Sequence, residues 1–170
     1  MRSIKRVSRR AFFGRAAILA SAAWLAACEP ISIASNSGPS IDATAPVPVA
    51  LLVPSGSANQ GDAVLARSLE NAARMAMADL GGVQIDLQVY STAGTAAGAS
   101  AAATQAANNG AKIILGPVYS EAANAAGLAV ASRGINVLSF PNNTAIAGGN
   151  VFVLGQTFRN TADRLVSYSR

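Results

Sequence analysis

The sequence predicts an α/β fold with a doubly wound parallel sheet, and two observations lead to this class. From residue 46 onward, short apolar runs alternate with longer segments that have helical spacing or are rich in alanine. Loops that carry glycine separate the runs from these segments. This part of the chain has no cysteine for a disulfide, so a packed core must stabilise it. Alternating strands and helices of this size form βαβ units with right-handed crossovers.

The first strand is expected at residues 47–53, an apolar run with the length of a buried strand. Pro48 stands near its start, where a missing N–H donor is tolerated. The loop that follows, 55–61, is rich in glycine and serine. We expect Asp62 to be the N-cap of a helix that ends at Gly81 and has one apolar stripe.

Residues 83–90 alternate apolar and polar side chains, so the second strand is expected to be half exposed and near a sheet edge. An alanine-rich helix is expected over 95–109, because small side chains suit close packing on a sheet. A short buried strand over 112–115 follows, and Gly116 and Pro117 end it.

The last part of the chain continues the same alternation. A third helix is expected over 120–132, with Ser120 as its cap, and a fourth strand over 135–139. A fifth short strand over 151–154 and a helical segment over 161–169 complete the pattern.

Residues 1–27 have the composition of a lipoprotein signal peptide. An arginine-rich start precedes a short apolar segment, and the sequence Leu-Ala-Ala-Cys over 25–28 matches the bacterial lipobox. The apolar segment, 16–27, is shorter than the roughly 20 residues that a membrane-spanning helix needs. We therefore expect Cys28, the only cysteine, to become a lipid-bearing N-terminus, and residues 28–45 to form a flexible linker.

The same region predicts a location. Residues 8–13 resemble the twin-arginine export consensus, and the general secretory route is the alternative. Both routes lead to the far side of a bacterial inner membrane. Glu29 follows the cysteine and favours the outer membrane. We therefore expect a periplasmic protein that its lipid anchors to a bacterial membrane, with the outer membrane favoured.

Charge and composition argue against several functions. The whole chain has a net charge of +5, but six of its thirteen basic residues precede Cys28. Beyond that point seven scattered basic residues stand against eight acidic ones, so the net charge is −1 and no basic patch for nucleic acid is expected. The chain has no histidine and its acidic residues are isolated, so we expect no enzyme activity, no metal and no cofactor.

A ligand is expected at the carboxyl ends of the strands, where open α/β sheets bind their ligands. Four loops meet there, and they are rich in hydroxyl and amide groups next to helix starts, where free backbone N–H groups can hold an anion. Ordinary turn and capping chemistry is the alternative for any one of these side chains. The candidate ligand-binding residues are Ser55, Ser57, Tyr119, Ser120, Ser139, Asn142 and Asn143.

The order of these segments resembles the type 1 periplasmic binding proteins, in their Leu/Ile/Val-binding branch. The segments that carry the resemblance are 49–56, 69–73, 114–120 and 135–139. The resemblance implies that Ser120, together with the group of Ser139, Asn142 and Asn143, holds the carboxylate and ammonium groups of a ligand.

One departure from that family changes the expected function. Residues 140–144 read Phe-Pro-Asn-Asn-Thr, where the amino-acid binders usually have small residues and a threonine. This loop, the lipid anchor and residues 148–155 look more like the penicillin-binding protein activator lipoproteins. That resemblance implies a non-enzymatic activator whose partners are a membrane and a peptidoglycan synthase. The alternative is a solute receptor that binds branched-chain amino acids or related small molecules and serves an ABC permease.

Members of this family have two lobes, and residues 46–170 account for most of one. The second lobe, which closes the ligand cleft in the family, has no counterpart in these residues. We therefore expect the chain to be a fragment or a truncated gene product.

Overall fold

The computed structural model describes residues 38–169. The expected signal peptide over 1–27, the lipidated Cys28 and the first part of the linker lie outside the described residues. Residues 38–45, the last part of that linker, contain turns and no helix or strand. They are mostly exposed.

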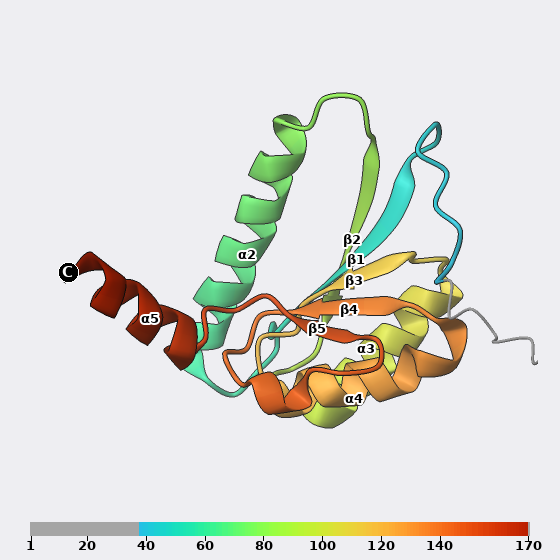
Figure 1. Cartoon of the computed structure of the whole chain (residues 1–170). Coiled ribbons are helices and arrows are strands. Elements are labelled where there is room, and N and C mark those ends of the chain that lie inside the picture. The colour runs from blue at the N-terminus through green and yellow to red at the C-terminus, as the bar shows by residue number, and fades with distance from the viewer. Residues whose placement is uncertain (1–37, 170) are drawn as a thin grey trace, which may run out of the picture. The chain divides into compact units, whose positions relative to one another are not determined.

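Five strands form one sheet in which every named pair is parallel, and this confirms the predicted class (Figure 1). The order across the sheet is β2-β1-β3-β4-β5. The strands are β1 (Val47–Val53), β2 (Ile85–Ser91), β3 (Ile113–Leu115), β4 (Asn136–Ser139) and β5 (Val151–Val153). Strand β2 lies at one edge and is only partly buried, as its alternating sequence predicts.

Helices connect the strands and lie on both faces of the sheet (Figure 1). They are α2 (Gln60–Ala78), α3 (Ala96–Asn108), α4 (Ser120–Val130) and α5 (Phe158–Tyr168), with the short 3-10 turns η1 (Ala131–Arg133) and η2 (Thr144–Ile146). Helices α3 and α4 pack against each other on one face, whereas α2 packs on the opposite face beside β1 and β2.

The core has two parts because the sheet has two covered faces. On the α3 and α4 side, Leu52, Ile114 and Val137 meet the fully buried alanines of the two helices. Small side chains let the helices approach the sheet closely, as expected of the alanine-rich segment. On the α2 side, a smaller cluster surrounds Leu51 and Val53.

Two predicted helix starts and one predicted helix cap are wrong. Helix α2 begins at Gln60 with Asn59 as its N-cap, so Asp62 lies inside the first turn. Asp62 does not act as a cap, because its carboxylate accepts from the Tyr119 hydroxyl instead of from its own backbone. Helix α4 has Tyr119 as its N-cap, and Ser120 is its first residue. Helix α5 begins at residue 158, three residues earlier than predicted.

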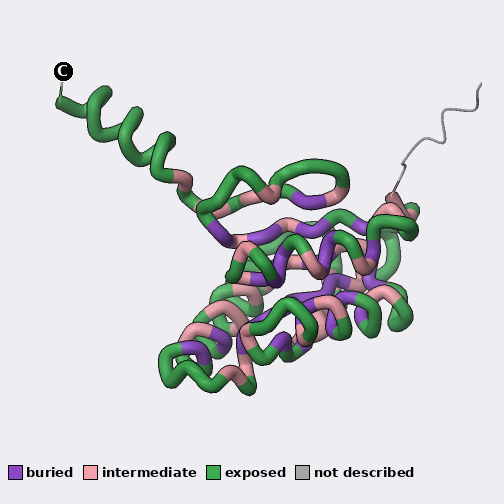
Figure 2. The backbone as a smooth tube through the Cα atoms, turned by 90° about the horizontal axis from the view of Figure 1, so that it is seen from below, coloured by how far each residue is buried: buried purple, intermediate pink, exposed green. Residues whose placement is uncertain are grey.

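The cause at α5 is a threonine cap that the prediction overlooked. Thr157 Oγ1 accepts the backbone N–H of Asn160 at 3.2 Å, which satisfies one of the free donors of the first turn. None of the side chains of α5 is buried, and the helix extends away from the sheet (Figures 1 and 2).

Candidate functional site

The carboxyl ends of β1 and β3 form the switch point of the sheet. The chain leaves β1 toward β2 on one side and later returns to β3 on the other side. The loop after β1 leads into α2 on one face, and the loop after β3 leads into α4 on the opposite face. Such a divergence opens a crevice between the two loops, where ligands of open α/β sheets bind.

A carboxylate lies beneath this crevice. The side chain of Asp62, in the first turn of α2, is only 5% exposed. Tyr119 Oη donates to Asp62 Oδ1 at 2.6 Å, and Asn59 Nδ2 donates to Asp62 Oδ2 at 3.5 Å. Ser57 Oγ accepts a hydrogen bond from the backbone N–H of Asn59 at 3.1 Å, and this bond turns the loop toward the Asp62 carboxylate.

The two acids of this cluster titrate away from their ordinary values. Hydrogen bonds from the hydroxyls of Ser57 and Tyr119 lower the pKa of Asp62. The bond to Asp62 raises the pKa of the Tyr119 phenol. Both shifts favour one state, in which the carboxylate is charged and the phenol keeps its proton.

A shallow pocket of about 560 Å³ lies beside this cluster. Its lining comes from the end of the β1 loop and from the starts of α3 and α4: Asn59, Gly94, Thr95, Ala96, Tyr119, Ser120, Glu121 and Ala122. Thr95 Oγ1 caps α3 by accepting the N–H of Gly98 at 3.0 Å, whereas no side chain caps α4. The first-turn N–H groups of α4 are therefore donors without a side-chain partner at the pocket wall.

The structure brings together three of the predicted ligand residues. Tyr119 and Ser120 line the pocket, and Ser57 lies at the carboxylate under it. Ser55 belongs to the same loop as Ser57 but does not line the pocket. The carbonyl oxygen of Ser55 accepts from Ser91 Oγ. The turn that Ser55 forms therefore links the β1 and β2 loops.

The other predicted ligand residues lie elsewhere. Ser139 is 0% exposed, and its hydroxyl donates to the carbonyl oxygen of Phe152 at 2.9 Å, so this group is used inside the fold. Asn142 and Asn143 line a separate hollow beside the start of α5. Asn143 Oδ1 also accepts the N–H of Ala145 at 2.9 Å and thereby caps η2.

Sequence reasoning missed several members of the site, among them Asp62, Thr95 and Glu121. It assigned Asp62 to helix capping, since an acidic residue after a glycine-rich loop usually has that role. It also left out Thr95, although a threonine between a strand and an alanine-rich helix is a recognisable cap signal. The contact between Asp62 and Tyr119 joins residues that are far apart in the sequence, and no local pattern indicates it.

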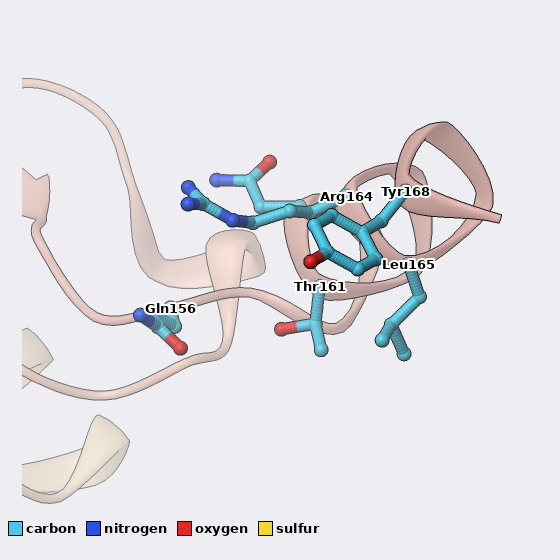
Figure 3. A pocket seen from close by; sticks show the side chains of 6 residues that line it. Gln156, Thr161, Arg164, Leu165 and Tyr168 are labelled. Carbon is cyan, nitrogen blue, oxygen red and sulfur yellow. The ribbon is translucent and has the colours of Figure 1, made fainter. Parts of the chain in front are cut away.

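A further hollow lies along α5 and not at the switch point. Figure 3 shows Gln156 on the segment before the helix, with Thr161, Arg164, Leu165 and Tyr168 on the helix itself. The helix has no buried side chain, so no packing against the rest of the fold fixes the residues that line this hollow. It contains none of the predicted ligand residues.

The described residues also limit other kinds of site. Within 38–169, no group of three or more His, Cys, Asp or Glu side chains lies close enough to hold a metal ion. In the same range no helix is both long enough and apolar enough to cross a membrane.

A parallel sheet covered on both faces, with a crevice at its switch point, defines a class of open α/β domain, and comparison with known proteins identifies the family. Residues 46–170 match the periplasmic binding protein family, and the chain belongs to that family. None of the curated proteins matches the chain.

Solved structures share the fold at low sequence identity. The chain is similar to a leucine-binding protein, LivK, from Thermotoga maritima, with 18% identity and a TM-score of 0.59 over 72% of this chain and 37% of that one. It is also similar to LivJ, a branched-chain amino acid transporter substrate-binding protein from Streptococcus pneumoniae solved with isoleucine. There the identity is 16% and the TM-score 0.56, over 64% of this chain and 33% of that one.

A third similar structure is the leucine-, isoleucine-, valine-, threonine- and alanine-binding protein from Brucella ovis, in its closed conformation. Its identity is 19% and its TM-score 0.53, over 74% of this chain and 37% of that one. The chain thus spans about a third of the length of these structures.

Proposed function

We propose that this chain is a ligand-holding lobe of a non-enzymatic periplasmic solute-binding protein, and that it binds a small amino acid at the switch-point pocket. The observation that carries this proposal is the pocket itself, where the starts of α3 and α4 meet the loop after β1. Membership of the periplasmic binding protein family supports it.

The pocket provides groups for both charges of an amino acid. The first-turn N–H groups of α4 and the hydroxyl of Ser120 suit a carboxylate, since a helix start carries partial positive charge. Glu121 lines the same pocket and suits an ammonium group. The similar structures include proteins named for leucine, isoleucine and valine, so L-leucine is the first ligand to test. An ABC permease would then be the partner.

Calorimetric titration of the full chain with L-leucine tests this proposal. Replacing Ser120 by Ala (S120A) should weaken binding about tenfold or more, because a hydrogen bond to a charged group is lost. Ser132→Ala is the matched control, since Ser132 is an exposed serine in η1 that does not line the pocket. Equal leucine affinity in S120A and the original protein would contradict the assignment.

A second candidate is an activator of a peptidoglycan synthase, and one observation favours it. The resemblance to amino-acid binders assigns Ser139 to the ligand. In the structure Ser139 is buried, and its hydroxyl donates to the carbonyl oxygen of Phe152. In that case the lobe would serve as a protein-binding module that responds to no small solute. Adding the full chain to a purified peptidoglycan synthase should raise its rate of glycan polymerisation or cross-linking, and leucine should leave the melting temperature unchanged.

Both candidates include lipid anchoring at Cys28 as part of the proposal. The Cys28→Ser variant should move from the membrane fraction to the soluble periplasmic fraction, because the thiol that takes the lipid is gone. Retention of this variant in membranes would rule out a lipid anchor at this position.

A further inference from the structure

Three loops of the carboxyl edge converge on one side chain, that of Asp62. The loop after β1 reaches it through Ser57 and Asn59, and the loop after β3 reaches it through Tyr119. The loop after β2 reaches it through Gly94. A Cβ placed on Gly94 would lie 3.2 Å from Asp62 Oδ2 and 3.0 Å from Ser57 Oγ.

Gly94 is therefore packed against the carboxylate without a side chain between them. Its φ of +68° also lies in the left-handed region, where a residue with a Cβ is strained. The neighbouring Ala93 has a φ of +50°, so the whole turn after β2 adopts an unusual conformation. This turn leads directly into Thr95 and the pocket wall.

No cation compensates the buried carboxylate within residues 38–169. The ion pairs there join Arg74 to Glu70 and Arg159 to Asp163, on exposed helix surfaces. Hydrogen-bond donors from neighbouring loops stabilise the charge of Asp62 instead. Burying a charge is unfavourable, and a hydrogen-bonded buried carboxylate beside a cleft is a candidate functional group.

We propose that Asp62 is the positioning residue of the ligand edge, and that its carboxylate holds the loops after β1, β2 and β3 in one fixed arrangement. The consequence for ligand affinity rests on the proposed function. Asp62 acts through Tyr119, which is the N-cap of α4, so holding its ring fixes the first turn of that helix and with it Ser120.

The alternative is a purely structural role, in which Asp62 only stabilises the start of α2. The two roles differ in reach. A local role predicts changes confined to the first turn of α2, whereas a positioning role predicts changes in three loops that are distant in sequence. Hydrogen exchange followed by mass spectrometry resolves these loops separately.

The test compares Asp62→Ala, Asp62→Asn and Tyr119→Phe in the full chain. Asp62→Ala should speed amide exchange about tenfold in all three loops, at residues 54–59, 92–95 and 116–119. Asp62→Asn should recover part of the protection, because the amide keeps one acceptor oxygen for the Tyr119 hydroxyl. Tyr119→Phe should have no further effect in the Asp62→Ala background, since the two changes remove one interaction.

Matched controls come from the same residue types elsewhere. Asp79→Ala changes an exposed aspartate at the other end of α2, and Tyr168→Phe removes the hydroxyl of a tyrosine that is 94% exposed. Neither should alter exchange in the three loops. If Asp62→Ala does not fold, Tyr119→Phe alone carries the test, because it removes a single oxygen atom.

Leucine titration of the same variants separates this proposal from the proposed function. Faster exchange in all three loops together with weaker leucine binding supports both. Faster exchange in a protein that binds no leucine supports the positioning role and contradicts the ligand. Two outcomes would overturn the role of Asp62. One is amide exchange that changes only in the first turn of α2; the other is faster exchange in the three loops with an unaltered leucine affinity.

Discussion

At the scale of the residue, the bond between Asp62 and Tyr119 makes the fold sensitive to pH in two ranges. The pKa of Asp62 is lowered in the folded protein. Its contribution to stability is therefore complete above the ordinary aspartate pKa of 3.8 and is lost as pH falls through the folded value. The pKa of Tyr119 is raised, so its contribution is present below the ordinary 10.0 and is lost as pH rises further.

Urea unfolding at several pH values checks the acidic range. The original protein should lose more stability than Asp62→Asn between pH 5 and pH 3, because only the original has a carboxylate there that must take up a proton. Hydrogen bonds from Thr44 lower the pKa of Asp42 as well. Both proteins contain Asp42, so the difference between them removes its contribution to the pH dependence. Parallel losses in both proteins would contradict the charged state assigned to Asp62.

At the scale of the element, the packing of α4 on β5 depends on one glycine. A Cβ on Gly127 would lie 2.2 Å from Cγ2 of Val151, a distance that packed atoms do not reach. The side chain of Asn150 strengthens the same contact, because its Nδ2 donates to the carbonyl oxygen of Gly127 at 3.0 Å. With any larger residue, either the Val151 side chain or the helix must shift.

The Gly127→Ala variant should lower the free energy of unfolding by about 1–3 kcal/mol through overpacking, despite the better helix propensity of alanine. The free energy can be measured by urea unfolding. Gly61→Ala is the matched control, since a Cβ on Gly61, in α2, meets no atom within 4 Å and its φ is not in the left-handed region. That control should be neutral or slightly stabilising. Equal effects of the two changes would contradict the contact.

The elements could be predicted well where the sequence pattern is local. The strand over 47–53 and the thin helix near 95–109 follow from an apolar run and an alanine-rich run, and both lie where expected. The helix starts were less accurate, because Asp62 and Ser120 look like caps while other residues occupy those positions. Of the candidate site, Tyr119 and Ser120 could be found from their loop. The position of Ser139 could not, because its burial depends on the neighbouring strand β5.

At the scale of the whole described domain, one row of side chains shows how unevenly the sheet is covered. Val89, Leu51, Leu115, Leu138 and Phe152 lie in register across the five strands. Leu51, beneath α2, is 1% exposed, whereas Phe152 on β5 is 46% exposed. Helix α2 covers the β1 and β2 half of this face, and α5 packs on neither half.

This uncovered apolar surface should bind a hydrophobic dye. Phe152→Ser should reduce the fluorescence of bound anilinonaphthalene sulfonate, because the variant removes the most exposed side chain of the row. Leu128→Ser is the matched control, since Leu128 is 72% exposed on α4, outside this row. A larger loss of fluorescence from the control would place the dye on the helical face instead.

The alanines between α3, α4 and the sheet have a thermodynamic consequence. Ala99, Ala103 and Ala126 are fully buried, yet each of them removes little apolar surface from water. The heat capacity change of unfolding scales with that surface, so it should be small for a chain of this size. A small heat capacity change flattens the curve of stability against temperature. Close contact between thin helices therefore gives a domain whose stability should vary little between the cold and ordinary growth temperatures.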